Sequence, residues 1–208
     1  MLSAAFQAMV RHVGAKRHEA VLTELKREFE ARTGVFGAGD AWFEARSAAF
    51  LDDALASRGM ARLTEEDLTP AERAYVEPIE RAHRGLFRAS REGKKWRLTD
   101  VWSGIELVAD EPDSGLLDAL ATASGYFDAR VVGAMDGAVV EIALMPGAVF
   151  HAEDATRAID ALLPLARERA MGTEEFLDAL LRMDHALRSL SRVKAGFAYR
   201  ADALGGRR

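Results

Sequence analysis

The chain has 208 residues, of which 49% are hydrophobic and 29% are charged, proportions ordinary for one globular domain with a substantial core. Its formal net charge of −5 excludes a global attraction to nucleic acid or to an anionic membrane. The lack of cysteine excludes disulfide bonds and thiolate metal sites. No apolar run reaches the roughly 18 residues of a membrane span, and residues 1–10 lack the basic start of a signal peptide, so we expect no membrane association and a cytoplasmic location.

Residues 1–84 carry the spacing of amphipathic helices and are predicted to form an N-terminal helical region. Within residues 2–32, apolar side chains recur at helical spacing on two faces, one before Gly14 and one after it. Glycine weakens a helix because it leaves the backbone free, but it does not always end one. The pattern therefore leaves open whether residues 2–32 form one helix or two.

Two further helices are predicted in this region. Residues 33–39 hold three glycines and indicate a loop, and Asp40 follows where it can cap a helix over residues 41–57. That helix carries a large apolar stripe rich in aromatic side chains. Residues 69–72, Thr-Pro-Ala-Glu, combine an N-cap, a proline at the first helical position and a capping-box glutamate. We expect a helix from there to Arg84.

Residues 85–150 are the only part of the chain where apolar and polar side chains alternate, which is typical of strands with one buried face. Alternation is found in five segments: 85–91, 95–100, 105–110, 126–134 and 138–144. These segments predict an antiparallel sheet of about five strands, either flat or curled into a small barrel.

Short turns between these segments set the expected pairing, since a shift by one residue would turn every apolar side chain outward. The strongest turn signal is Asp136-Gly137, because a type I′ turn requires positive φ at both central residues. The turns place these residues opposite each other: Phe87 and Leu98 through residues 92–93, Leu98 and Leu107 through residues 102–103, and Val131 and Ile142 through residues 136–137.

Residues 151–190 predict a C-terminal helical pair. The first helix covers residues 152–170 and should be kinked at Pro164, and Gly172 separates it from the second. Residues 191–208 show no pattern and indicate a loose tail. The predicted fold is therefore α+β, with N-terminal helices, a central antiparallel sheet and a C-terminal helical pair in one compact domain.

The basic first hairpin, residues 84–98, is a candidate site for single-stranded nucleic acid. The cations that would contact it are Arg84, Arg88, Arg91, Lys94 and Arg97. Phe87 and Trp96 lie among them, as in surfaces on which bases stack. The alternation, however, puts both rings on the face opposite to Arg88 and Arg97, where they would belong to the core.

Acidic residues that follow the hairpin favour another interpretation. The expected register sets Lys95 opposite Asp110 and Arg97 diagonal to Glu106, and such cross-strand pairs are stabilising. A solvent face that neutralises its own charge is therefore favoured over a nucleic-acid site.

The sequence shows no metal-binding or catalytic motif. The five histidines are scattered, and none belongs to a His-Glu-x-x-His motif. No Gly-x-Ser-x-Gly elbow is found, and residues 34–39 lack the lysine and hydroxyl of a phosphate loop. We expect no metal and no cofactor. An enzyme stays an alternative without identifiable residues, and a deep pocket that holds charged groups with strongly shifted pKa values would favour it.

Several short motifs resemble a group of uncharacterised bacterial proteins, some of which end in a cysteine-rich SEC-C metal motif. The resemblance spans about residues 34–163, and its motifs lie at residues 40–44, 70–73, 85–88, 98–104 and 127–132. It implies an aromatic helix followed by a small antiparallel module, and it implies no particular activity. Because this chain has no cysteine, the metal motif of that group is missing.

These observations favour a non-catalytic cytoplasmic module that binds another protein or stabilises an assembly. The first alternative is a nucleic-acid-binding protein that uses the hairpin at residues 84–98, and the second is an enzyme with an unrecognised site. Titration of a labelled single strand at low salt separates the first two, because nucleic-acid binding weakens steeply with salt.

Overall fold

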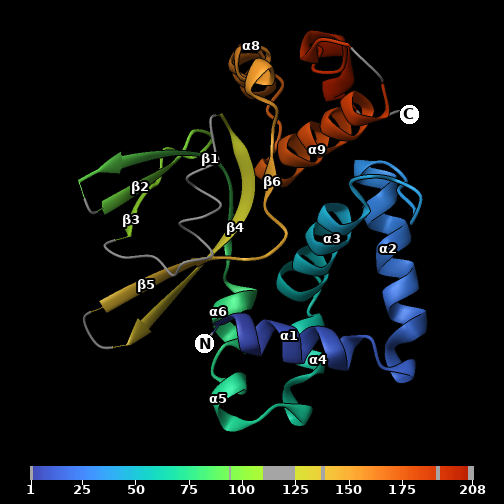
Figure 1. The fold of residues 1–208 in the computed structure, drawn as a ribbon, viewed down its shortest axis with the longest axis vertical. Helices are drawn as coiled ribbons and strands as arrows, with labels where there is room; N and C mark the ends of the chain where they lie inside the picture. The colour runs from blue at the N-terminus through green and yellow to red at the C-terminus, as the bar shows by residue number, and fades with distance from the viewer. Residues whose placement is uncertain (1, 94, 110–124, 137–138, 191–192, 206–208) are drawn as a thin grey trace.

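The computed structural model describes residues 2–93, 95–109, 125–136, 139–190 and 193–205. In this part of the chain an antiparallel sheet is flanked by helices, which confirms the predicted α+β fold (Figure 1). The sheet lies at the left of the view, the N-terminal helices at the lower right and the C-terminal helices at the top. None of the helices that the structure describes is long and apolar enough to span a membrane.

The strands of the sheet are β1 (His83–Glu92), β2 (Lys95–Asp100), β3 (Glu106–Ala109), β4 (Phe127–Asp136), β5 (Val139–Leu144) and β6 (Val149–Phe150). Their order is β3-β2-β1-β4-β5, each neighbouring pair is antiparallel, and β6 pairs with β4. The end strands β3 and β5 approach each other, so the sheet curls toward a barrel. Phe87, Leu98 and Phe127 are fully buried in one apolar cluster inside the curl.

The predicted register between β1 and β2 is wrong by two residues. Phe87 lies opposite Asp100 instead of Leu98. The reason is that Glu92 pairs with Lys95, so the connection comes one position later than predicted, and Gly93 takes the positive φ of 65° that a tight turn favours. A shift by two residues keeps every side chain on its predicted face.

The pairing of β4 and β5 is wrong in the same way, because Val131 lies opposite Leu144 and not Ile142. The connecting residues 137–138 lie outside the part that the structure describes. The pairing of β2 and β3 is confirmed, since Leu98 lies opposite Leu107. Alternation alone does not distinguish registers two residues apart, because both bury the same face.

The first residues form two helices, α1 (Leu2–Val13) and α2 (Glu19–Thr33), separated by a 3-10 turn at Lys16–His18. The sequence left open whether residues 2–32 form one helix or two, and the structure shows two. The chain turns after Gly14, where Ala15 is extended with ψ of 144°. Phe6, Met9 and Phe29 from these helices pack in one core cluster.

The next helix is α3 (Phe43–Ser57), and its predicted cap is wrong. The N-cap is Trp42, which makes no capping hydrogen bond through its side chain. Asp40 instead accepts the backbone N–H of Gly37 at 2.8 Å and so closes the preceding loop. Farther along the chain, Gly147 packs directly on α3, because a Cβ there would lie 2.6 Å from the Cα of Ala49.

Short helices follow: α4 (Met60–Leu63), a 3-10 turn at Glu65–Asp67, α5 (Pro70–Arg73) and α6 (Val76–Glu80). The predicted capping box between Thr69 and Glu72 is confirmed, with the backbone N–H of Thr69 donating to the Glu72 carboxylate at 2.9 Å. The predicted single helix to Arg84 is wrong. Pro78 lacks the N–H that a continuous helix needs, and Arg84 belongs to β1.

The C-terminal part contains a 3-10 turn at Glu153–Ala155, α8 (Thr156–Glu168), α9 (Thr173–Ser189) and two 3-10 turns at Ala195–Phe197 and Ala201–Leu204. Pro164 lies inside α8, as expected. The expected loose tail is wrong for the described residues, because Tyr199 and Leu204 are buried with α8 and α9. The hydroxyl of Tyr199 also lies 2.7 Å from Nδ1 of His151.

Candidate functional site

The structure buries one cation of the basic hairpin and leaves others exposed. Arg84 is only 8% exposed and faces α9, where it pairs with Asp178 at 2.9 Å. Arg88 and Arg91 are exposed, and Lys94 lies outside the described residues. The described cations of the hairpin therefore do not form one exposed surface.

The exposed cations of the hairpin are engaged within the protein. Arg97 donates to Glu92 at 3.0 and 3.1 Å and to Glu106 at 2.6 Å, which confirms the predicted diagonal pair with Glu106. These hydrogen bonds raise the pKa of Arg97. The guanidinium of Arg88 lies 4.8 Å from the ring centre of Tyr126. The predicted partner of Lys95, Asp110, lies outside the described residues.

The aromatic rings of the hairpin belong to the interior of the sheet. Phe87 is fully buried, and Trp96 is half-buried against the same cluster. The guanidinium of Arg91 lies 6.0 Å from the centre of the Trp96 ring. A half-buried ring beneath a guanidinium is poorly placed to stack with a base.

The structure brings together a second group of charges that the sequence does not reveal, the buried ion network. One centre of the network is Arg84 on β1. Its Nε and one terminal nitrogen bind the Asp128 carboxylate at 3.2 and 2.8 Å, and its other terminal nitrogen binds Asp178 and Glu174. Although burial favours the neutral form, the nearby Asp128 raises the pKa of Arg84 well above its usual value.

The other centre is Asp53 on α3, which is 4% exposed. Its carboxylate accepts from Arg32 at 2.7 Å, from Arg130 at 3.2 Å and from Arg58 at 3.5 Å. Arg32 also donates to Asp178 at 2.5 Å and so links the two centres. The network thereby joins α2, α3, β1, β4 and α9 through charge-assisted hydrogen bonds.

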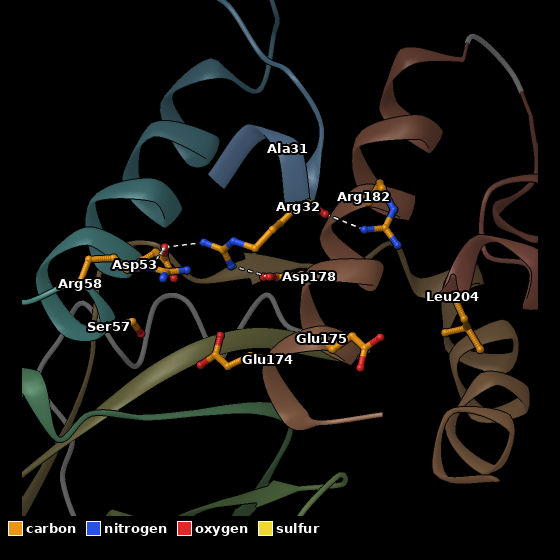
Figure 2. Close-up of a pocket in the computed structure, with 10 residues that line it drawn as sticks. All are labelled: Ala31, Arg32, Asp53, Ser57, Arg58, Glu174, Glu175, Asp178, Arg182 and Leu204. Atoms are coloured by element: carbon orange, nitrogen blue, oxygen red, sulfur yellow. Dashed lines mark hydrogen bonds and ion pairs between the residues drawn. The ribbon is translucent and has the colours of Figure 1, made fainter. Parts of the chain in front are cut away.

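The network forms one wall of a pocket of about 540 Å³, a size typical of ligand sites. Its lining consists of Ala31, Arg32, Asp53, Ser57, Arg58, Glu174, Glu175, Asp178, Arg182 and Leu204. Figure 2 shows Arg32 between Asp53 and Asp178, with Ser57 and Arg58 at one end and Leu204 at the other. Glu174 and Glu175 lie on the opposite side of the pocket from Arg32.

A small cavity of about 20 Å³ lies in the core beside the network. It is lined by Asp52, whose carboxylate accepts the backbone N–H of Gly147 at 2.9 Å through one oxygen. Among the described residues the other oxygen has no hydrogen-bond partner. Burial raises the pKa of Asp52 to about 8, so this acid is protonated at neutral pH.

Three neighbouring side chains have the residue types of a catalytic triad but not its arrangement: Ser103, Asp100 and His83. Both His83 and Ser103 hydrogen-bond to the same carboxylate oxygen of Asp100, at 3.0 and 2.5 Å. In a triad the histidine lies between the hydroxyl and the carboxylate. Asp100 also accepts the backbone N–H groups of Leu86 and Trp102, so the set holds the end of β2 in place.

The described residues contain no group of three or more histidine, aspartate or glutamate side chains that could hold a metal ion. Comparison with protein-family models, with curated proteins and with solved structures finds no match for this chain. The resemblance to the group of uncharacterised bacterial proteins, some of which carry a SEC-C motif, therefore stays a prediction.

Sequence reasoning missed the ion network because its members come from five separate elements. The sequence contains one signal of the network, the charged pair Asp128 and Arg130. These two residues alternate with the apolar residues Phe127, Ala129 and Val131, and this alternation is typical of a strand whose polar side faces solvent. Both are in fact buried, at 4% and 5% exposure. A pair of opposite charges in one strand is compatible with a solvent face and with a buried ion pair.

Proposed function

We propose that this protein is a non-catalytic cytoplasmic module that binds another protein through the outward side of β1, β2 and β3. This surface, the sheet face, consists of Arg88, Ser90, Glu92, Lys95, Arg97, Thr99, Glu106 and Val108, which share one side because each pair lies opposite in the register. Val108 lies directly opposite Arg97 and is 45% exposed.

The observation that supports this proposal is the arginine held between two glutamates. Arg97 donates hydrogen bonds to Glu92 and Glu106, so the sheet face presents an arginine already paired with two carboxylates beside an exposed valine. A nucleic-acid phosphate would have to displace these carboxylates, whereas a protein surface can match charges of both signs and cover the valine. Protein interfaces are also enriched in arginine.

The carboxylates of the ion network support a role without catalysis. Asp53, Asp128 and Asp178 each accept hydrogen bonds from at least one arginine, so their oxygens are already engaged within the protein. Asp52 keeps its proton at neutral pH, but its side chain is buried in the core beside the small cavity.

The test compares two valines of nearly equal exposure, Val108 at 45% and Val21 at 46% on α2. Immobilised wild-type protein and the variants Val108→Arg and Val21→Arg are incubated with extract of the native host at gentle salt, and retained proteins are identified by mass spectrometry. We expect a partner that wild type and Val21→Arg retain and that Val108→Arg loses. With the purified partner, Val108→Arg should weaken binding at least about tenfold, or about 1.4 kcal/mol.

Nucleic-acid binding is the competing outcome. A labelled single-stranded oligonucleotide is titrated with wild type and Arg88→Glu at low and moderate salt. Binding that weakens steeply with salt and disappears in Arg88→Glu would overturn the proposal in favour of the hairpin as a nucleic-acid site. Equal retention of every protein by Val108→Arg and wild type would overturn it as well.

A further inference from the structure

The small cavity beside the ion network is lined by an acid with one unpaired oxygen. Asp52 on α3 is 2% exposed, and one of its carboxyl oxygens accepts the backbone N–H of Gly147 at 2.9 Å. The other oxygen, Oδ1, is buried and forms no hydrogen bond in the part of the chain that the structure describes. Because buried polar atoms in native proteins are nearly always hydrogen-bonded, this oxygen indicates a partner that the described residues do not supply.

The cavity has the size of a single water molecule. Its volume of about 20 Å³ exceeds the roughly 10–15 Å³ that one water needs, and it leaves no room for a larger guest. A buried water also needs about two to four polar partners, whereas a purely apolar cavity stays dry. Beside Asp52, four charged side chains from α3, β1 and β4 line the cavity: Asp53, Arg84, Asp128 and Arg130.

The charges around the cavity favour a neutral guest. Arg84 binds Asp128 at 2.8 Å and Arg130 binds Asp53 at 3.2 Å, so each guanidinium of the lining already has a carboxylate. Burial raises the pKa of Asp52 to about 8, so its own carboxyl group is uncharged at neutral pH. A cation would lie beside two guanidiniums and an anion beside three acids. A water molecule carries no charge, and it can accept a hydrogen bond from one side and donate to another.

We propose that the small cavity binds one internal water molecule, held by Oδ1 of Asp52 and by the charged side chains of the ion network that line the cavity. The protonated carboxyl group of Asp52 donates to the water oxygen, and the water donates onward to a carboxylate of the network. The water thereby connects a buried acid of α3 to the charges that join the sheet with α9. Internal waters of this kind are part of the folded structure and are costly to remove.

The first test is a crystal structure of the wild-type protein at a resolution that shows ordered water. We expect one ordered water within about 3.2 Å of Oδ1 of Asp52, with a second polar partner among the charged residues of the cavity. Crystals grown with rubidium or thallium(I) ions distinguish a cation, because both ions have an anomalous signal that water lacks. Anomalous density in the cavity, or a cavity without any density, would overturn the inference.

The second test changes the site in solution. Asp52→Leu replaces the carboxyl group by a larger hydrocarbon, whereas Asp52→Asn keeps a polar group at the cavity and an oxygen for the N–H of Gly147. Oxygen-17 magnetic relaxation dispersion counts the long-lived internal waters of each protein. We expect Asp52→Leu to lose one such water relative to wild type and Asp52→Asn to keep it. The matched control is Asp202→Leu, at a side chain that is 69% exposed, which should keep the wild-type number.

Equal numbers of long-lived waters in Asp52→Leu and wild type would overturn the inference. If Asp52→Leu does not fold, the crystal structure of the wild-type protein decides the question by itself. The sheet face is a separate surface, and its test uses Val108, which does not line the cavity. A failure of the water site therefore leaves the proposed protein-binding function standing, and the reverse also holds.

Discussion

Asp52 shows how one buried acid makes stability depend on pH. It is 2% exposed, and burial raises its pKa to about 8, whereas an aspartate in the unfolded chain has a pKa of about 3.9. Between these values the folded protein keeps a proton that the unfolded chain has lost. The contribution of Asp52 to the free energy of unfolding therefore decreases as pH rises from about 4 to about 8, by up to about 1.4 kcal/mol per pH unit.

Replacement of this acid by its amide should remove that dependence. In Asp52→Asn the side-chain oxygen can still accept the backbone N–H of Gly147, and nothing titrates. We expect the variant to resemble wild type near about pH 4 and to exceed it in stability increasingly toward about pH 8. Urea denaturation across this range measures the difference, with the exposed Glu168→Gln as control. A difference that does not change with pH would contradict the prediction.

At the scale of elements, the C-terminal segment is held by side-chain hydrogen bonds as well as by packing, and the bond of Tyr199 is among the buried ones. Tyr199 is 3% exposed, and its hydroxyl lies 2.7 Å from Nδ1 of His151. Nε2 of His151 has no partner among the described residues, and burial lowers the pKa of this histidine. The hydroxyl is thus the hydrogen-bond partner of Nδ1, the one ring nitrogen of this imidazole that is paired within the described residues.

Tyr199→Phe keeps the ring and removes this hydroxyl. We expect it to lower the free energy of unfolding by about 1–3 kcal/mol, because the imidazole of His151 loses its partner inside the core. Chemical denaturation measures the loss. Phe197→Leu is the control, since Phe197 lies in the same segment but is 66% exposed. Equal effects of the two substitutions would show that the hydrogen bond does not hold the segment.

At the scale of the whole molecule, Arg84 joins the sheet to the C-terminal helices. It lies on β1, pairs with Asp128 on β4 and reaches Asp178 on α9. Arg32 continues the connection from Asp178 to Asp53 on α3. The relative placement of these elements therefore depends on a chain of buried charges whose partners are all supplied by other elements.

Arg84→Met should lower the free energy of unfolding by about 3–5 kcal/mol, because the buried Asp128 loses its only arginine partner in the described network. Arg97→Met, at an exposed pair, should lower it much less, because water screens the interaction. Denaturant titration compares the two. If Arg84→Met does not fold, Arg84→Lys should fold with an intermediate loss, since it keeps the charge but not the two-point contact. Similar losses for Arg84→Met and Arg97→Met would refute the role of the network.

The sequence by itself determined the features that depend on near neighbours. The capping box at Thr69 and Glu72 is formed within one helical turn, and the strands follow from local alternation. The faces of Phe87 and Leu98 follow from the same alternation. Local alternation does not determine the strand register, however, because two registers that differ by two residues bury the same face. The conformation of Gly93 selects one of the two registers.

Only the tertiary structure decided which polar residues are buried and what they contact. Arg84 was grouped with the exposed arginines of the hairpin, although it is covered by α9, which begins almost ninety residues later in the chain. Asp53 and Asp178 carried no pattern that links them, yet both bind Arg32. Alternation records which side of a strand a residue occupies, whereas burial of that side depends on helices brought there by packing across the whole chain.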